Sequence, residues 1–136
     1  CSLVTGIAGI SENIHINGII DRYLEHSRIF IFANGGEEKY YIGSADWMPR
    51  NLDNRIEVLA PVYDKEIQAD LKRIVCYGYR DTAKGRIVDG TGENRPWENR
   101  PSTLCKDFTP ALAEAETATV VFRSQEELYR KYKNTL

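Results

Sequence analysis

His26 and Arg28 stand one residue apart at the start of a strand-like run, SRIFIF at 27–32. Alternate side chains of an extended segment point to the same face. An imidazole, which can take up or release a proton, would then lie beside a permanent cation. Such a pair can bind a phosphate oxygen, and His26 can donate a hydrogen bond or a proton to it. The alternative is a surface histidine at the end of a short helical turn over 23–25.

Arg55 is the second candidate phosphate ligand. Its guanidinium presents a planar fork of donors that grips phosphate through two hydrogen bonds, which a lysine ammonium cannot do. We expect Arg55 to begin a strand over 55–60, with Glu57 on the same face. The alternative is an ion pair between Arg55 and either Glu57 or Asp53, and local sequence does not decide between the two.

Polar residues between these candidates could complete an anion site. Gly43 would let the backbone approach a ligand closely, while Ser44 and Asp46 would offer a hydroxyl and a carboxylate. Arg50 and Asn51 follow in a turn or a single helical turn. A structural turn of similar composition is common, so this segment alone is a weak signal.

The remaining pattern predicts the elements that must position these side chains. Asn34, Gly35 and Gly36 favour a hairpin turn. Asp64 is expected to cap a helix to about residue 77 with Gly78 after its end, and Ser124 to open a capping box. The expected strands cover 1–4, 14–20, 27–32, 39–44, 55–60 and 80–88, and the helices 64–77 and 124–134. Strands interleaved with helices indicate an α/β domain, with a mobile loop over 90–101.

Composition limits the class of protein. The 136 residues are 42% hydrophobic, enough for a single domain with a core, and the net charge of −2 gives no global attraction for polyanions. No apolar run is long enough for a membrane span, and no signal peptide is visible. Cys1, Cys76 and Cys105 are odd in number and form no CxxC pair, which argues against a zinc site or disulfide framework and for a reducing cytoplasm. The start at Cys1 suggests a fragment.

The candidate residues fall within a set of ordered motifs: GISENI at 9–14, YLEHSR at 23–28, NGG at 34–36, YIGSADWMPRNLD at 41–53 and RIEV at 55–58. This set strongly resembles the C-terminal domain of bacterial polyphosphate kinases. The resemblance is clear over residues 1 to 90 and looser beyond them. It implies a phospholipase D-like mixed sheet flanked by helices, truncated at its N-terminal side, with residues 1–136 forming one partial domain.

Two departures from the phospholipase D pattern bear on the chemistry. His26-x-Arg28 stands where those enzymes have His-x-Lys, and Ser44-x-Asp46 where they have Ser-x-Asn. The acidic residue expected at position 33 is Ala33, which counts against phosphodiester hydrolysis. A phospholipase D-like phosphodiesterase and a non-catalytic module for polyanion binding or assembly remain the alternatives.

The resemblance implies reversible transfer of the γ-phosphoryl group of ATP to inorganic polyphosphate, through a phosphohistidine in a preceding domain. His26 matches the family's assisting histidine, and Arg55 matches a phosphate-binding arginine. The expected partners are ATP, ADP, polyphosphate, the other domains and further copies in a homo-oligomer, with no nucleic acid. The Mg²⁺ ligands are expected in those other domains, so no metal ligand is assigned here. The expected location is cytoplasmic, peripheral to the membrane as part of the full-length enzyme, and this piece alone is expected to be inactive.

Overall fold

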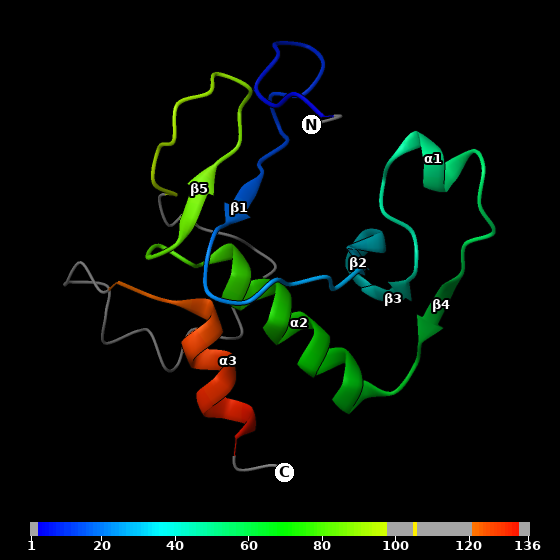
Figure 1. The fold of residues 1–136 in the computed structure, drawn as a ribbon. Helices are drawn as coiled ribbons and strands as arrows, with labels where there is room; N and C mark the ends of the chain where they lie inside the picture. The colour runs from blue at the N-terminus through cyan, green and yellow to red at the C-terminus, as the bar shows by residue number, and fades with distance from the viewer. Residues whose placement is uncertain (1–2, 98–104, 106–120, 134–136) are drawn as a thin grey trace. The chain divides into compact units, whose positions relative to one another are not determined.

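The computed structural model describes residues 3–97, 105 and 121–133 (Figure 1). The elements, in chain order, are β1 (Asn17–Ile19), β2 (Ile29–Phe32), the 3₁₀ turn η1 (Asn34–Gly36), β3 (Lys39–Gly43), α1 (Pro49–Leu52), β4 (Leu59–Val62), α2 (Lys65–Tyr79), β5 (Gly85–Ile87) and α3 (Ser124–Tyr132). They confirm the expected α/β class. The chain divides into two compact units, which we call unit 1 (Cys1–Leu24 and Ile74–Leu136) and unit 2 (Glu25–Arg73).

Unit 2 contains a three-stranded antiparallel sheet in the order β2-β3-β4. The β2–β3 hairpin turns through η1, where Asn34, Gly35 and Gly36 have φ of 44°, 67° and 107°. These left-handed conformations are the ones that Asn and Gly tolerate best, so the predicted hairpin turn is confirmed.

The expected strand over 55–60 starts too early. β4 begins at Leu59, opposite Gly43, the last residue of β3. Beyond Gly43 the chain turns away toward α1, so residues 55–58 have no partner strand in unit 2. The hydroxyl of Ser44 accepts a hydrogen bond from the Val58 N–H at 3.0 Å, in place of a backbone carbonyl. Arg55 consequently lies in the bend between α1 and β4 rather than on a strand.

Helix α2 starts as predicted and ends later. The Asp64 carboxylate accepts hydrogen bonds from the N–H groups of Glu66 at 2.9 Å and Ile67 at 3.0 Å, which confirms the N-cap. The helix then runs through Gly78 instead of ending before it. A Cβ at Gly78 would lie 3.3 Å from Cδ1 of Ile19, so this glycine provides close packing within unit 1 rather than a C-terminal cap.

Unit 1 contains the antiparallel pair β1–β5 and the helix α3. The predicted capping box at Ser124 is wrong. The Ser124 hydroxyl and N–H donate to Oδ2 of Asp81 at 2.7 and 2.8 Å, and both residues are buried. Because this distant carboxylate takes the hydroxyl, α3 begins after Arg123 with no side-chain cap.

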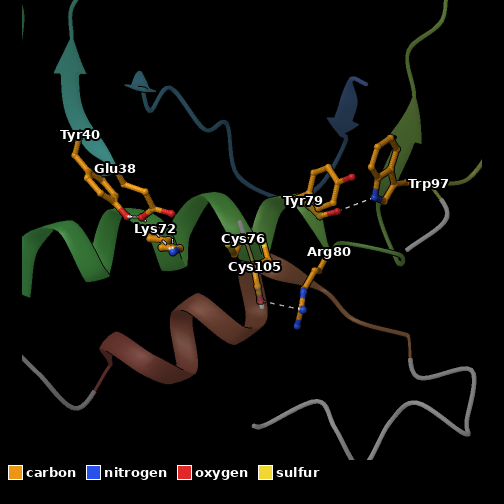
Figure 2. The surroundings of a disulfide bond; sticks show 8 residues. All are labelled: Glu38, Tyr40, Lys72, Cys76, Tyr79, Arg80, Trp97 and Cys105. Carbon is orange, nitrogen blue, oxygen red and sulfur yellow. Dashed lines mark hydrogen bonds and ion pairs between the residues drawn. A yellow bond between two sulfur atoms is a disulfide. The ribbon is translucent and has the colours of Figure 1, made fainter. Parts of the chain in front are cut away.

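Cys76 and Cys105 form a disulfide bond (Figure 2), which corrects the expectation of unpaired cysteines. Both residues are buried, and Arg80 Nη2 donates to the Cys105 carbonyl at 3.2 Å. The cysteines are 29 residues apart in sequence, so nothing in their local spacing reveals the pairing.

Three further expectations concern connecting segments. Residues 3–4 form no strand, and residues 21–23 make a bend with no helical turn at 23–25. In the loop over 90–101, the buried Trp97 donates from Nε1 to the Tyr79 carbonyl at 2.6 Å, which anchors the described part (Figure 2). Residues 98–101 lie outside the described residues, and mobility of the loop stays a prediction. Within the described part of the chain, every helix is too short or too polar to cross a membrane.

Candidate functional site

The predicted pair of His26 and Arg28 meets on one carboxylate in unit 2. Asp46 Oδ1 accepts a hydrogen bond from Arg28 Nε at 2.9 Å and lies 3.2 Å from His26 Nε2. Arg28 Nη2 lies 2.6 Å from the same imidazole nitrogen. The alternation of the extended segment thus brings the imidazole and the guanidinium together as expected, and Asp46 fixes their arrangement.

The position of the His26 proton decides which partner the imidazole takes. Arg28 can only donate, so Nε2 accepts from it when the proton is on Nδ1. When Nε2 carries a proton, it can instead donate to Asp46. The His26 side chain is 65% exposed and therefore open to a ligand. In this arrangement the His26 imidazole can donate a hydrogen bond to a bound phosphoryl oxygen or exchange a proton with it.

A second carboxylate, Glu57, gathers three more of the predicted residues. It accepts hydrogen bonds from the Ser44 hydroxyl and from Asn51 Nδ2, the latter at 3.0 Å. Arg55 Nε lies 3.5 Å from Glu57 Oε1. The ion pair weighed as the alternative for Arg55 is therefore present. This ion pair is formed through Nε of Arg55. Within the described residues no hydrogen bond uses the two terminal nitrogens of the guanidinium, and the Arg55 side chain is 62% exposed.

Asn51 is a buried residue that holds Glu57 in position. The short helix α1 buries it to 1% exposure, and its donor nitrogen is committed to Glu57. Its Oδ1 has no hydrogen-bond partner in the described part of the chain, and an amide oxygen does not attract an anion. In this arrangement Asn51 and Ser44 reach a phosphate only by releasing Glu57. Arg50, one residue earlier on α1, is exposed and forms no ion pair with any described residue.

Electrostatics link the two carboxylates. The hydrogen bond from Arg28 and its charge lower the pKa of Asp46, and His26 contributes in the same direction. Hydrogen bonds from Ser44 and Asn51 lower the pKa of Glu57, as do the charges of Arg55 and Arg28. Arg28 therefore acts on both carboxylates, and Ser44, which donates to Glu57, is two residues from Asp46 in sequence, so the two clusters are neighbours. Both carboxylates are ionised at neutral pH and hold their cations in position.

Gly43 has a different role from the one expected. A Cβ at this position would lie 3.1 Å from Cε2 of Phe30 and 3.1 Å from Cδ1 of Leu59. The missing side chain thus makes room for packing at the end of β3 rather than for a ligand. Trp47 stacks on Phe30 with ring centroids 5.8 Å apart, which holds the loop that carries Ser44 and Asp46.

Sequence reasoning missed the organising role of the two carboxylates. Asp46 appeared only as a possible oxygen ligand, and Glu57 only as a competitor for Arg55. Within the described residues no group of three His, Cys, Asp or Glu side chains could hold a metal ion. The oxygens of Asp46 and Glu57 already accept hydrogen bonds from cationic, amide and hydroxyl donors, so they do not form a site for a resident Mg²⁺. The arginine and imidazole groups that they hold suit an anion instead.

The comparisons with known proteins identify the family of this chain. Residues 1–106 match the family model described as polyphosphate kinase C-terminal domain 2. The polyphosphate kinase of Escherichia coli strain K12 is 47% identical over 122 residues, which is 85% of this chain and 18% of that protein. The polyphosphate kinase of Thermosynechococcus vestitus is 42% identical over 120 residues, covering 88% of this chain and 15% of the relative.

A solved structure agrees with these sequence matches. The crystal structure of polyphosphate kinase from Porphyromonas gingivalis superposes with a TM-score of 0.70 at 34% identity, over 92% of this chain and 17% of that one. The chain thus spans less than a fifth of the length of these relatives. The matched family model covers most of the 136 residues, including both carboxylate clusters. The chain belongs to the polyphosphate kinase family, within its C-terminal domain 2.

Proposed function

We propose that this chain supplies part of the phosphoryl-transfer site of a polyphosphate kinase. In the full protein, the γ-phosphoryl group of ATP passes reversibly to inorganic polyphosphate through a phosphohistidine on a preceding domain. The observation that supports this role is the placing of His26 and Arg28 on Asp46, beside Arg55 on Glu57. Two guanidinium groups and one imidazole held by buttressing carboxylates form a site for phosphate oxygens.

The transfer spreads negative charge over the oxygens of the moving phosphoryl group, so positioned donors do most of the work. Arg55 offers its exposed terminal nitrogens to two of these oxygens. Arg28 adds a fixed positive charge, and His26 donates a hydrogen bond or proton to an oxygen that gains charge as the P–O bond breaks. Ser44, Asn51 and the exposed Arg50 line or support the same surface.

The other properties of the full protein belong to this proposal as well. Mg²⁺ would come with ligands from other domains, and we derive no step through it here. We propose a homo-oligomer in the cytoplasm, peripheral to the membrane. The cytoplasmic location now rests on the need for ATP, because the cysteine pattern that favoured it includes the Cys76–Cys105 pair. Phosphodiester hydrolysis is the weaker candidate, since Ala33 replaces its expected carboxylate.

The test uses the full-length polypeptide that carries this sequence. We expect His26→Ala and Arg55→Ala each to lower the rate of polyphosphate synthesis about 10²- to 10³-fold, as for other deleted electrostatic donors. His15→Ala removes the other histidine of the chain, which lies in unit 1, and should leave the rate within about twofold. Near-normal synthesis by both site variants would refute the proposal. The 136-residue chain alone should make no polyphosphate and should acquire no covalent phosphate on His26 from labelled ATP.

A further inference from the structure

A pocket with a basic lining lies in unit 1, apart from the residues that make up the proposed transfer site. It is about 480 Å³ and lies between the bend at 21–23 and helix α3. We call it the basic pocket. Its charged lining residues are Arg22, Arg123, Glu126, Arg130 and Lys133.

The lining carries four cations and one carboxylate, Glu126. Glu126 pairs with Arg123 and lies 4.0 Å from Arg130. Neither Arg22 nor Lys133 has an ion-pair partner among the residues that the structure describes. The Arg22 guanidinium instead lies 5.5 Å from the centroid of the Tyr23 ring.

The other carboxylates that neutralise these arginines do not line the pocket. Asp21 pairs with Arg123, but its side chain is only 2% exposed and lies behind the guanidinium. Glu127 pairs with Arg130 and is not part of the lining. Asp21, Glu126 and Glu127 therefore offset the charges of Arg123 and Arg130. The positive charge that a ligand meets comes from Arg22 and Lys133, in a chain whose net charge is −2. Local positive charge of this kind attracts anions without any global field.

Hydrogen bonds within the protein already hold the lining side chains in place without a ligand. Arg123 donates from Nε at 2.8 Å and from Nη2 at 2.6 Å to the two oxygens of Asp21, which lies 102 residues away in sequence. This bond raises the pKa of Arg123 and lowers that of Asp21, so the pair stays charged. Tyr23 N–H donates to Gln125 Oε1 at 3.0 Å, and Gln125 Nε2 donates to the Tyr23 carbonyl at 2.8 Å. Because these side chains are already held in place, binding a ligand costs little further side-chain entropy.

The polar groups of the lining favour phosphate groups as ligands. Gln125 is the one amide side chain of the lining, and both of its polar atoms are committed to Tyr23. Two aromatic rings, Tyr23 beside Arg22 and the exposed Tyr129, also line the pocket, so binding of single-stranded DNA is measured as the competing outcome. The arginine and lysine donors of the lining suit a linear run of phosphate groups.

We propose that the basic pocket binds a segment of polyphosphate away from its reacting end and so anchors long chains. This inference rests on the proposed function, and it adds a second contact for the same substrate. A second contact on one polymer raises the effective concentration of the reacting end, so only chains long enough to reach both sites would benefit.

The test neutralises Arg22 and Lys133 in the full-length polypeptide. The double variant Arg22→Gln/Lys133→Gln is compared with Lys39→Gln/Lys131→Gln, which removes two exposed lysines outside the pocket. Binding of labelled long-chain polyphosphate, tripolyphosphate and single-stranded DNA is titrated over a range of salt. Because binding is measured without turnover, the result does not depend on the transfer chemistry, and labelling of the protein by ATP is scored separately.

We expect the pocket variant to lose about tenfold in affinity for long-chain polyphosphate. The slope of log affinity against log salt concentration should correspond to about two fewer released counterions. Tripolyphosphate should lose clearly less affinity than the long chain, and labelling by ATP should not change. Equal affinity for long chains in the pocket variant and wild type would overturn the anchor, as would an equal loss in the control. A loss confined to DNA would overturn it in favour of a nucleic-acid site. Absence of labelling in the wild type would count against the proposed function while leaving the anchor result intact.

Discussion

Arg28 Nη2 lies 2.6 Å from Nε2 of His26, while Nε of the same guanidinium donates to Asp46 at 2.9 Å. The imidazole nitrogen thus has a donor on one side and, at 3.2 Å, the Asp46 acceptor on the other. Adding a proton at Nε2 exchanges Arg28 for Asp46 as its partner. The position of the His26 proton therefore decides which of its two charged neighbours the imidazole nitrogen binds.

The first prediction separates positioning by Asp46 from its charge. Asp46→Asn removes a negative charge close to an anion site, which by itself would favour phosphate binding. It also weakens the hydrogen bonds that orient Arg28 and His26. We expect kcat for polyphosphate synthesis to fall about 10²-fold while KM for ATP stays the same or falls, the pattern of a lost transition-state interaction. Steady-state kinetics of the full-length protein measure both constants.

Asp46→Glu is the matched variant, because it keeps the charge and displaces the oxygens. We expect it to recover part of the lost kcat. An unchanged kcat in Asp46→Asn, or a raised KM with normal kcat, would show that Asp46 does not position the reacting groups.

The second prediction concerns Glu57 as the support of the other cluster. In Glu57→Gln the negative charge is lost and an amide nitrogen replaces one acceptor oxygen, which weakens the hydrogen bonds from Ser44 and Asn51 and removes the ion pair with Arg55. We expect a lower urea midpoint of unfolding for the chain and slower polyphosphate synthesis in the full protein. Glu37→Gln, at an exposed position next to η1, is the control and should change neither quantity. An unchanged midpoint in Glu57→Gln would contradict the supporting role.

Local signals predicted the parts of the fold that depend on a few neighbouring residues. The Asn34–Gly36 turn and the Asp64 cap follow from backbone conformation and short-range hydrogen bonds, and both were predicted. The start of β4 was not, because pairing at Leu59 depends on where β3 ends at Gly43. Side-chain identity along 55–60 carries no information about that distant partner.

The same division holds for side-chain roles. The Ser124 hydroxyl matched a capping pattern, but its partner is Asp81, 43 residues away in sequence. In the site, strand alternation was enough to pair His26 with Arg28. It could not show that Asp46 would hold them, because that contact forms only when β2 and the loop after β3 come together.

The third prediction tests the Cys76–Cys105 bond. Its removal frees a loop of 29 residues in the unfolded chain, so Cys76→Ala/Cys105→Ala should lower the free energy of unfolding by about 2–4 kcal/mol under non-reducing conditions. Reductant should destabilise the wild type by a similar amount and leave the double variant unchanged. Chemical denaturation with and without reductant measures both effects.

Thiol titration checks that bond independently. The denatured, non-reduced chain should expose one reactive thiol of its three cysteines, and Cys1→Ala should expose none while keeping full stability. Three reactive thiols in freshly prepared protein would rule out the disulfide.

The fourth prediction uses Asp89, whose pKa is lowered to about 2. The main cause is the hydrogen bond from the Thr91 hydroxyl at 2.7 Å, followed by the Thr91 N–H at 3.1 Å and by Arg95. A lowered carboxyl pKa means that the native state holds the ionised form. Its contribution to stability is therefore complete above pH 3.8, the ordinary value, and disappears as the pH falls to about 2.

Asp89→Asn should accordingly have a lower Tm than the wild type above about pH 4, and the gap should close as the pH falls toward 2. Asp53→Asn, at an exposed position, is the control and should track the wild type throughout. An NMR titration of the carboxyl carbons measures the pKa directly. Titration of Asp89 near its ordinary value, or a Tm gap that persists to pH 2, would mean that Thr91 and Arg95 do not hold the ionised carboxylate in solution. The connection after β5 would then be looser than the structure describes, and the strand pair β1–β5 would lose one of its anchors.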